Sequence, residues 1–149
     1  MNPTSSVRLF GGVGEIGGNT ILVEDGDTKL LLDFGKNFPR FNMYFNYPFN
    51  IPSRSITREL IKTGVVPHIT STDGKPLKIF VDYEDGQPKE SRGDAAFSGV
   101  LVTHAHSDHT GNLTILKDSI SLHMGSMTSL LHRTSMETRR ESSIETKLY

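Results

Sequence analysis

The chain of 149 residues has no cysteine and no tryptophan. Without thiols, neither disulfide bonds nor thiolate metal sites can form, so any bound metal must be held by nitrogen and oxygen atoms. No apolar run approaches the roughly 20 residues that a membrane-spanning helix needs. The N-terminus also lacks the charged-then-apolar pattern of a secretory signal. We therefore expect a cytoplasmic protein without a membrane partner.

A strong excess of charge of either sign is also missing. Sixteen lysines and arginines stand against seventeen acidic residues, for a formal net charge of −1. This balance gives no electrostatic reason to infer nucleic-acid binding, although it is compatible with a local basic groove. Hydrophobic residues make up 35% of the chain, which is enough for the core of one domain or of a large part of one.

Short apolar runs and turn signals predict the secondary structure. Runs at 7–10, 19–24 and 29–34 predict an antiparallel meander, whose second turn is at Asp25-Gly26. Further along we expect a helix at 55–63, a strand at 77–81, a polar turn region at 82–94, a buried strand at 97–103, a helix at 109–117, a strand at 119–124, and a helix from Ser126 that frays into the polar end 135–149. The predicted class is α/β (α+β), with helices covering a mixed sheet.

The segment 38–49 is rich in aromatic residues, asparagine and proline and has no clear period. Its aromatic residues are Phe38, Phe41, Tyr44, Phe45, Tyr47 and Phe49. We expect an irregular loop whose aromatic side chains pack onto the domain. A patch that faces a substrate or a partner is the alternative.

Four candidate metal ligands follow the apolar strand 99–103: His104, His106, Asp108 and His109. Alternate residues at a strand end point the same way, so the first two histidines can share one metal ion. The chain then turns into a helix, where the aspartate and the last histidine can face a second ion. These ligands suit zinc, and also manganese. Two such ions can hold a bridging hydroxide as a nucleophile.

Other residues near these runs have simpler explanations. His68, His123 and His132 are expected to be ordinary loop, strand and helix residues. Asp33 closes an apolar strand, where a carboxylate is costly unless it is paired, although it can also simply cap a turn. The glycine-rich segment 11–19 matches no phosphate-binding loop, because another strand follows it, and it is expected to make a tight inter-strand loop.

Three strings occur in the order known from one family: Gly-Gly-Val-Gly-Glu-Ile-Gly-Gly-Asn at 11–19, Leu-Leu-Leu-Asp-Phe-Gly at 30–35, and Val-Thr-His-Ala-His-Ser-Asp-His-Thr-Gly-Asn-Leu at 102–113. Together they resemble the metallo-β-lactamase superfamily, and within it the ribonuclease J-like proteins of the β-CASP branch. The resemblance implies an αββα sandwich and a hydrolase that cuts RNA. It also implies a two-metal site, exonuclease and endonuclease action, and a homo-oligomer.

The resemblance assigns a role to each candidate residue. His104 and His106 would bind one divalent cation, and Asp108 and His109 the other. Asp108 would also position the attacking hydroxide, which makes it the catalytic candidate. Asp33 would sit beside the metals and orient their ligands.

The chain departs from the family pattern in two respects. The stretch 36–96 is longer than expected and is read as a family-variable insertion. The family's later ligands (a histidine, a bridging aspartate and a final histidine) and its β-CASP domain have no counterpart after His109. We therefore expect residues 1–149 to form only the N-terminal half of the hydrolase domain. With the second half and the β-CASP domain as missing partners, this piece should bind metal weakly and have little activity alone.

Three functions follow from the sequence. The leading hypothesis is a ribonuclease that cleaves phosphodiester bonds with a metal-activated hydroxide. A second keeps the metal site but acts on a thioester, a lactone or a lactam. A third is a truncated, non-catalytic metal-binding or interaction module.

Overall fold

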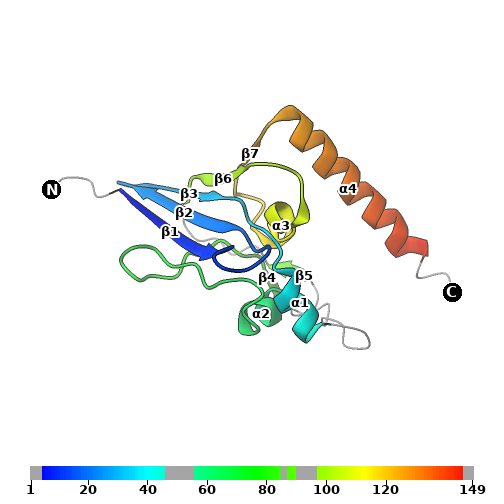
Figure 1. The fold of residues 1–149 in the computed structure, drawn as a ribbon, viewed down its shortest axis with the longest axis horizontal. Coiled ribbons are helices and arrows are strands. Elements are labelled where there is room, and N and C mark those ends of the chain that lie inside the picture. The colour runs from blue at the N-terminus through cyan, green and yellow to red at the C-terminus, as the bar shows by residue number, and fades with distance from the viewer. Residues whose placement is uncertain (1–4, 46–55, 85–86, 90–96, 146–149) are drawn as a thin grey trace.

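The computed structural model describes residues 5–45, 56–84, 87–89 and 97–145. A five-stranded sheet in the order β1-β2-β3-β6-β7 forms its centre (Figure 1). Its strands are β1 (Ser6–Gly11), β2 (Thr20–Asp25), β3 (Thr28–Leu32), β6 (Gly99–Val102) and β7 (Leu122–Met124). The first three strands are antiparallel, whereas β6 runs parallel to both β3 and β7. The mixed α/β class predicted from the sequence is confirmed.

The expected meander is also confirmed, together with its turn. Asp25 pairs with Thr28, so only two residues connect β2 to β3. Gly26 takes a positive φ of 56° there, which is the conformation that short hairpins with glycine use. The local sequence thus determines how the sheet begins.

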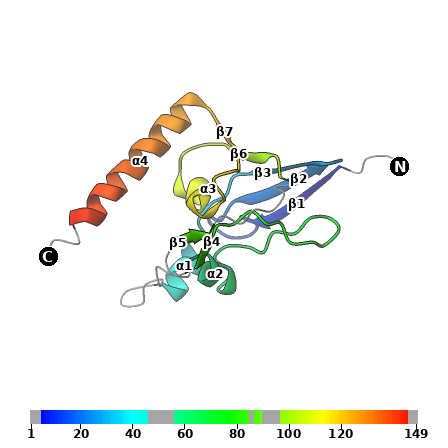
Figure 2. The same ribbon diagram turned by 180° about the vertical axis from the view of Figure 1, so that it is seen from behind.

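One face of the sheet is covered and carries the core. Helix α2 (Ile56–Lys62) and the segment 65–81 pack against this inner face (Figure 2). The fully buried apolar side chains include Leu22, Leu31, Phe34, Val65, Val66, Ile69, Ile79 and Val100. Gly64 follows α2 with a φ of 70°, as its predicted role of helix terminator requires.

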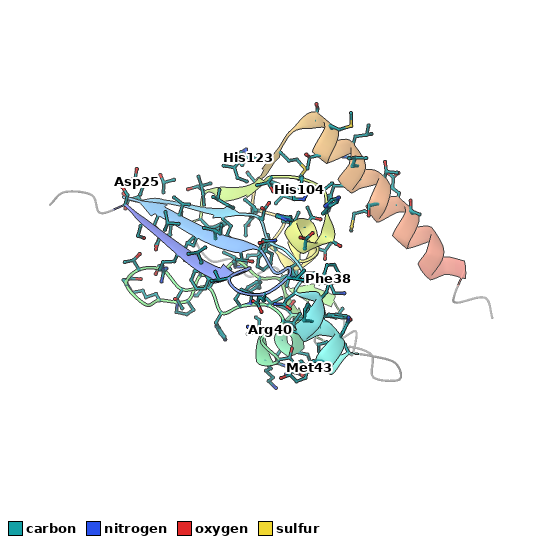
Figure 3. All side chains as sticks on the ribbon, viewed as in Figure 1. Asp25, Phe38, Arg40, Met43, His104 and His123 are labelled. Atoms are coloured by element: carbon teal, nitrogen blue, oxygen red, sulfur yellow. The ribbon has the colours of Figure 1, made fainter. Side chains whose placement is uncertain are left out.

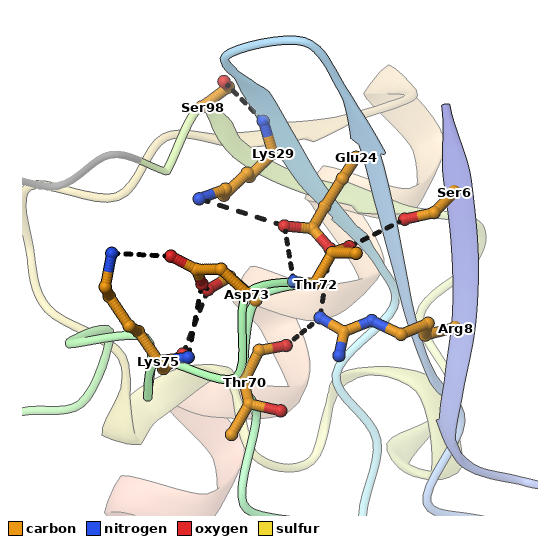
Figure 4. A network of polar contacts seen from close by, with 10 residues as sticks. Ser6, Arg8, Glu24, Lys29, Thr70, Thr72, Asp73, Lys75 and Ser98 are labelled. Atoms are coloured by element: carbon orange, nitrogen blue, oxygen red, sulfur yellow. Dashed lines mark hydrogen bonds and ion pairs between the residues drawn. The ribbon is translucent and has the colours of Figure 1, made fainter. Parts of the chain in front are cut away.

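A polar network connects the inner face of the sheet to the segment 65–81, which covers it (Figure 4). The buried carboxylate of Glu24 accepts a hydrogen bond from Arg8 Nη2 at 3.0 Å and lies 3.8 Å from Lys29 Nζ. It also accepts from the backbone N–H and the hydroxyl of Thr72. Burial alone would raise the pKa of Glu24, but the Thr72 hydrogen bonds and the two cations lower it below its usual value.

The opposite, outer face of the sheet is apolar. Strand register places Leu9, Ile21, Leu32 and Leu101 in one row, and Val7, Val23 and Leu30 in the next. Leu9 is 61% exposed and Leu101 is 45% exposed. Among the described residues no element covers this row, although monomeric proteins rarely expose contiguous apolar patches of this kind.

The expectation of an irregular loop at 38–49 was wrong for its first part. Residues Phe38–Tyr44 form helix α1. Asn37 caps this helix by accepting a hydrogen bond from the Arg40 backbone N–H at 3.0 Å, and Pro39 stands in its first turn. Phe41 and Phe45 pack against the core as expected. Residues 46–49 lie outside the described residues.

The predictions for 77–81 and 82–94 also need correction. No strand forms at 77–81, because this segment pairs with an irregular part of the chain. The N–H of Val81 donates to Ile115 O, and the N–H of Lys117 donates to Ile79 O, each at 2.9 Å. The expected polar turn region contains a short hairpin of β4 (Asp82–Glu84) and β5 (Gln87–Lys89), while 85–86 and 90–94 lie outside the described residues.

The predicted helix at 109–117 is shorter and begins earlier. Helix α3 covers Ser107–Thr110, and a single 3₁₀ turn follows at Leu113–Ile115. Asn112 ends the regular helix, because its backbone N–H donates to Phe34 O at 3.1 Å and its side chain donates to Gly35 O at 2.5 Å. These bonds draw the chain toward the end of β3 instead of onward along a helix axis.

The last helix is longer than the sequence suggested. Helix α4 spans Ser126–Glu145 and projects away from the sheet (Figures 1 and 2). The expected fraying after Thr134 is therefore wrong up to Glu145, since backbone hydrogen bonding continues along the polar sequence. In the described part of the chain, no helix is both long and apolar enough to cross a membrane.

Candidate metal centre

Parallel pairing of β3 and β6 brings two chain segments together at one sheet edge. Leu32 pairs with Leu101, and the N–H of Asp33 donates to Leu101 O at 2.8 Å. Asp33 and Thr103 thus leave their strands side by side. The histidine run begins at the next residue, and His104 lies beside α3 at this edge (Figure 3). The carboxyl ends of neighbouring parallel strands are a common place for functional sites.

Three of the predicted ligands gather in one cluster. Each of His104, His106 and Asp108 offers a ligand atom, and these atoms all lie within 4.8 Å of one another. The two imidazole rings meet edge to face with their centroids 4.7 Å apart. His106 is exposed and the other two residues are half-buried, so the cluster is open to solvent.

His109 lies beside this cluster, and its two ring nitrogens each lie close to a carboxylate. Its ring centroid is 4.0 Å from that of His104. Its Nδ1 lies 2.7 Å from Asp33 Oδ2, and its Nε2 lies 3.3 Å from Asp108 Oδ2. An ionised carboxylate can only accept, so Nδ1 carries the proton that bonds to Asp33.

The backbone of Asp33 is unusual in a way that serves this contact. Asp33 is buried and has a positive φ of 58°, which among non-glycine residues is tolerated best by aspartate and asparagine. Its carboxylate also accepts from the Thr103 N–H at 2.8 Å and from the Thr103 hydroxyl at 2.9 Å. The cost of burying this charge is therefore offset by hydrogen bonds on both oxygens.

Close backbone approach fixes α3 against the end of β3. A Cβ on Gly35 would lie 1.5 Å from the carbonyl oxygen of Asp108, so only glycine fits there. Phe34 N–H donates to His109 O and Lys36 N–H donates to Ser107 O, each at 2.9 Å. These backbone hydrogen bonds hold the candidate ligands on α3 in place, and they do not depend on the side chains of the residues that form them.

The glycine-rich segment forms the tight loop between β1 and β2 that the sequence predicted. Gly12, Gly14, Gly17 and Gly18 all have positive φ angles between 68° and 81°. Strand β2 follows directly, so no helix N-terminus is available to bind a phosphate. Gly17 packs beside the candidate ligand Asp108, since a Cβ on this glycine would lie 3.4 Å from the Cβ of that aspartate.

Sequence reasoning missed two residues that contact the cluster, Thr103 and Asn19. Thr103 Oγ1 lies 3.0 Å from His104 Nδ1, and Asn19 Nδ2 lies 3.2 Å from His109 Nε2. Thr103 directly precedes the histidines, which is a local signal, whereas Asn19 is separated from His109 by 90 residues. In the described part of the chain, no cluster of candidate ligands includes His68, His123 or His132.

The donor set fits a divalent transition-metal cation. Imidazole and carboxylate are typical zinc and manganese ligands. The ligand atoms of the three clustered residues lie no more than 4.8 Å from one another, which is close to the separation of atoms that bind one shared ion. His109 Nε2 and Asp108 Oδ2 lie 3.3 Å apart, a separation that one shared proton or one shared cation would bridge.

Comparison with known proteins gives distant similarity. The chain is 26% identical over 113 residues to "Ribonuclease J" of Helicobacter pylori strains 26695 and B128. The match covers 74% of this chain but only 12% and 11% of those proteins, so the chain spans about an eighth of their length. No family model matches.

A solved structure shares the fold. The crystal structure of a protein of unknown function from Enterococcus faecalis V583 superposes with a TM-score of 0.57 at 22% sequence identity. The superposition covers 86% of this chain and 27% of that one. The chain is thus similar in sequence, at a low level of identity, to proteins named Ribonuclease J, and its architecture recurs as part of a longer chain.

Proposed function

We propose that the chain is part of a metal-dependent hydrolase of the metallo-β-lactamase type, with RNA as its substrate. The main observation in support of this proposal is the cluster of His104, His106 and Asp108. It lies next to the contact between His109 and Asp33. The similarity to proteins named Ribonuclease J favours phosphodiester cleavage over other hydrolytic reactions.

Each residue has a role in this proposal. His104 and His106 would hold one divalent cation, and Asp108 and His109 a second, with zinc or manganese as the candidates. Bound cations supply two things: they lower the pKa of water toward 7 and offset charge on phosphate oxygens. The carboxylate of Asp108, which is 31% exposed, would orient the attacking water, and Asp33 would keep the His109 ring in place.

The outer face of the sheet supports the sandwich part of the proposal. The apolar row from Leu9 to Leu101 is suited to packing against a second sheet, as in an αββα sandwich. We propose that the second half of a hydrolase domain covers this face and supplies further ligands. The four ligands named above cannot saturate two cations, so we expect the chain alone to bind cations weakly and to turn over slowly.

Cleavage assays on the purified chain test the function. We expect slow, manganese- or zinc-dependent cleavage of 5′-monophosphorylated RNA that EDTA abolishes. H104A and H106A should remove both this activity and the cation binding seen by calorimetry. H68A is the matched control, because His68 is exposed and lies outside the cluster.

Other outcomes would contradict the proposal in distinct ways. Hydrolysis of a thioester, a lactone or a lactam with RNA left intact would assign the same cluster to another substrate class. RNA cleavage that persists in H104A would show that the activity does not depend on this cluster. Absence of cation binding at millimolar manganese and zinc would leave a non-catalytic module.

A further inference from the structure

We propose that two copies of this chain form a symmetric dimer in which helix α4 of each copy packs on the outer face of the other copy's sheet. Each copy then covers an unpartnered apolar surface of its neighbour and has its own surface covered. The dimer does not depend on the candidate metal centre. It goes beyond the proposed function because it names what covers the outer face in the chain by itself.

Helix α4 carries an apolar stripe near its start. The stripe consists of Met127, Leu130 and Leu131, which are 65%, 59% and 54% exposed. At 3.6 residues per turn these three positions lie on one side of the helix, whereas the half-buried Ser129 lies on the opposite side. The described residues therefore leave more than half of each side chain in the stripe in contact with solvent.

The outer face of the sheet is the second apolar surface without a partner. Its row from Leu9 to Leu101 crosses β1, β2, β3 and β6. The row is about 14 Å long, because neighbouring strands lie about 4.8 Å apart. The stripe on α4 is shorter, about 6 Å between the Cα atoms of Met127 and Leu131. The whole stripe can therefore lie on the row.

The helix of the same chain does not cover this face. Gly125 alone separates α4 from β7, the strand at one edge of the sheet. From that edge the helix projects away from the sheet in both views (Figures 1 and 2). A helix stripe and a sheet face are apolar surfaces that pack on each other as layers. The α4 of a second copy thus has the shape that the outer face requires.

A twofold axis covers both surfaces at once. In a twofold dimer each contact occurs twice, so each α4 lies on the sheet of the other copy. Each copy contributes six exposed apolar side chains, namely the three of the stripe together with Val7, Leu9 and Leu101 of the sheet. At roughly 100 Å² each, these side chains bury on the order of 1,200 Å² in the dimer, which reaches the lower limit for a stable interface.

The dimer and the proposed second half of the hydrolase domain use the same outer face. The two arrangements therefore exclude each other, and the dimer is a property of the 149-residue chain by itself. Cation binding is a separate property, because none of the candidate ligands comes from α4 or from the outer face.

Cysteine cross-linking tests which surfaces meet, since the chain has no cysteine of its own. L101C places a thiol on the outer face, and L130C places one on the stripe. We expect a mixture of the two variants to form disulfide-linked dimers on oxidation, whereas neither variant alone does so. S129C, on the opposite side of α4, is the control and should not cross-link to L101C.

Other cross-linking patterns would overturn the proposal. Dimers of L130C alone would show that two α4 helices pair with each other. Dimers of L101C alone would show that two sheet faces meet. Equal cross-linking of S129C and L130C to L101C would reflect random collisions.

Sedimentation equilibrium measures the strength of the dimer. We expect the wild type to be mainly dimeric at about 100 µM. L130S should raise the dissociation constant about 100-fold, because the substitution occurs twice in each dimer. M43S is the matched control, since Met43 is 73% exposed but lies on α1, outside both surfaces.

Two sedimentation results would contradict the dimer: a wild type that stays monomeric, or equal effects of L130S and M43S. A wild type that dimerises as expected but binds no cation would instead contradict the proposed function alone.

Discussion

Nδ1 of His109 lies 2.7 Å from Oδ2 of Asp33, although 76 residues separate them in the sequence. The contact joins the end of β3 to α3 and determines which nitrogen of the ring carries the proton. It also offsets the cost of burying Asp33. A single side-chain contact therefore serves both the fold and the candidate metal centre, and the two contributions can be separated by experiment.

Replacing Asp33 by asparagine should separate them. Asparagine tolerates the φ of 58°, so D33N should fold. Its neutral amide is a weaker acceptor for the His109 ring, and we expect cation affinity to fall about 10- to 100-fold. Calorimetric titration with manganese measures this, and D118N, at an exposed aspartate, is the control. Unchanged affinity in D33N would show that Asp33 serves the fold alone.

Gly35 should be the least replaceable glycine near the site. In G35A the new Cβ would lie 1.5 Å from the Asp108 carbonyl oxygen, and two backbone segments would have to separate. We expect a loss of about 3 kcal/mol or more in the free energy of unfolding, as for other severe steric conflicts. Urea denaturation followed by circular dichroism gives the value.

G14A is its matched control. Gly14, unlike Gly35, has a positive φ, 68°, but a Cβ there would meet nothing within 4 Å. Only the conformational cost remains, about 1–2 kcal/mol. If G35A and G14A cost the same, the close approach of α3 to β3 is wrong.

The sequence predicted those features that depend on neighbouring residues. Short apolar runs predicted the meander, and Asp25-Gly26 predicted its turn, since both signals act over a few residues. The position of His104 after a buried strand was also predictable, because the apolar run before it is unbroken. These local features were enough to place the candidate ligands directly after a buried strand.

Features that depend on distant contacts were not predictable. Asn112 ends α3 through its bonds to the end of β3, so the apolar spacing at 109–117 suggested too long a helix. The bond from Asn19 to His109 depends on strand pairing that brings the two residues together. Helix α1 is a different case, because the cap at Asn37 and the following proline were local signals that the aromatic composition obscured.

Acid should weaken the attachment of the covering segment through Glu24. Its pKa in the folded protein lies below the usual value of 4.5, so the ionised form is stabilised by folding. This contribution is complete above pH 4.5 and is lost as the pH falls through the folded-state pKa. E24Q should therefore be less stable than the wild type at pH 7, and the difference should shrink below pH 4.5. Urea midpoints at pH 7 and pH 3.5 measure it, and a constant difference would contradict the assignment.

The outer face of the sheet gives the most direct test of the proposed second half. Leu101 lies on this face and is 45% exposed, whereas its neighbour Val100 points into the core and is fully buried. L101S should leave the free energy of unfolding almost unchanged and reduce both self-association and binding of the dye ANS, because it interrupts the exposed row. V100A should instead cost roughly 2 kcal/mol through lost burial and a cavity. Sedimentation and ANS fluorescence distinguish the two. If L101S destabilises the chain as much as V100A does, the outer face is already covered within this chain, and the proposal that a second sheet packs there is wrong.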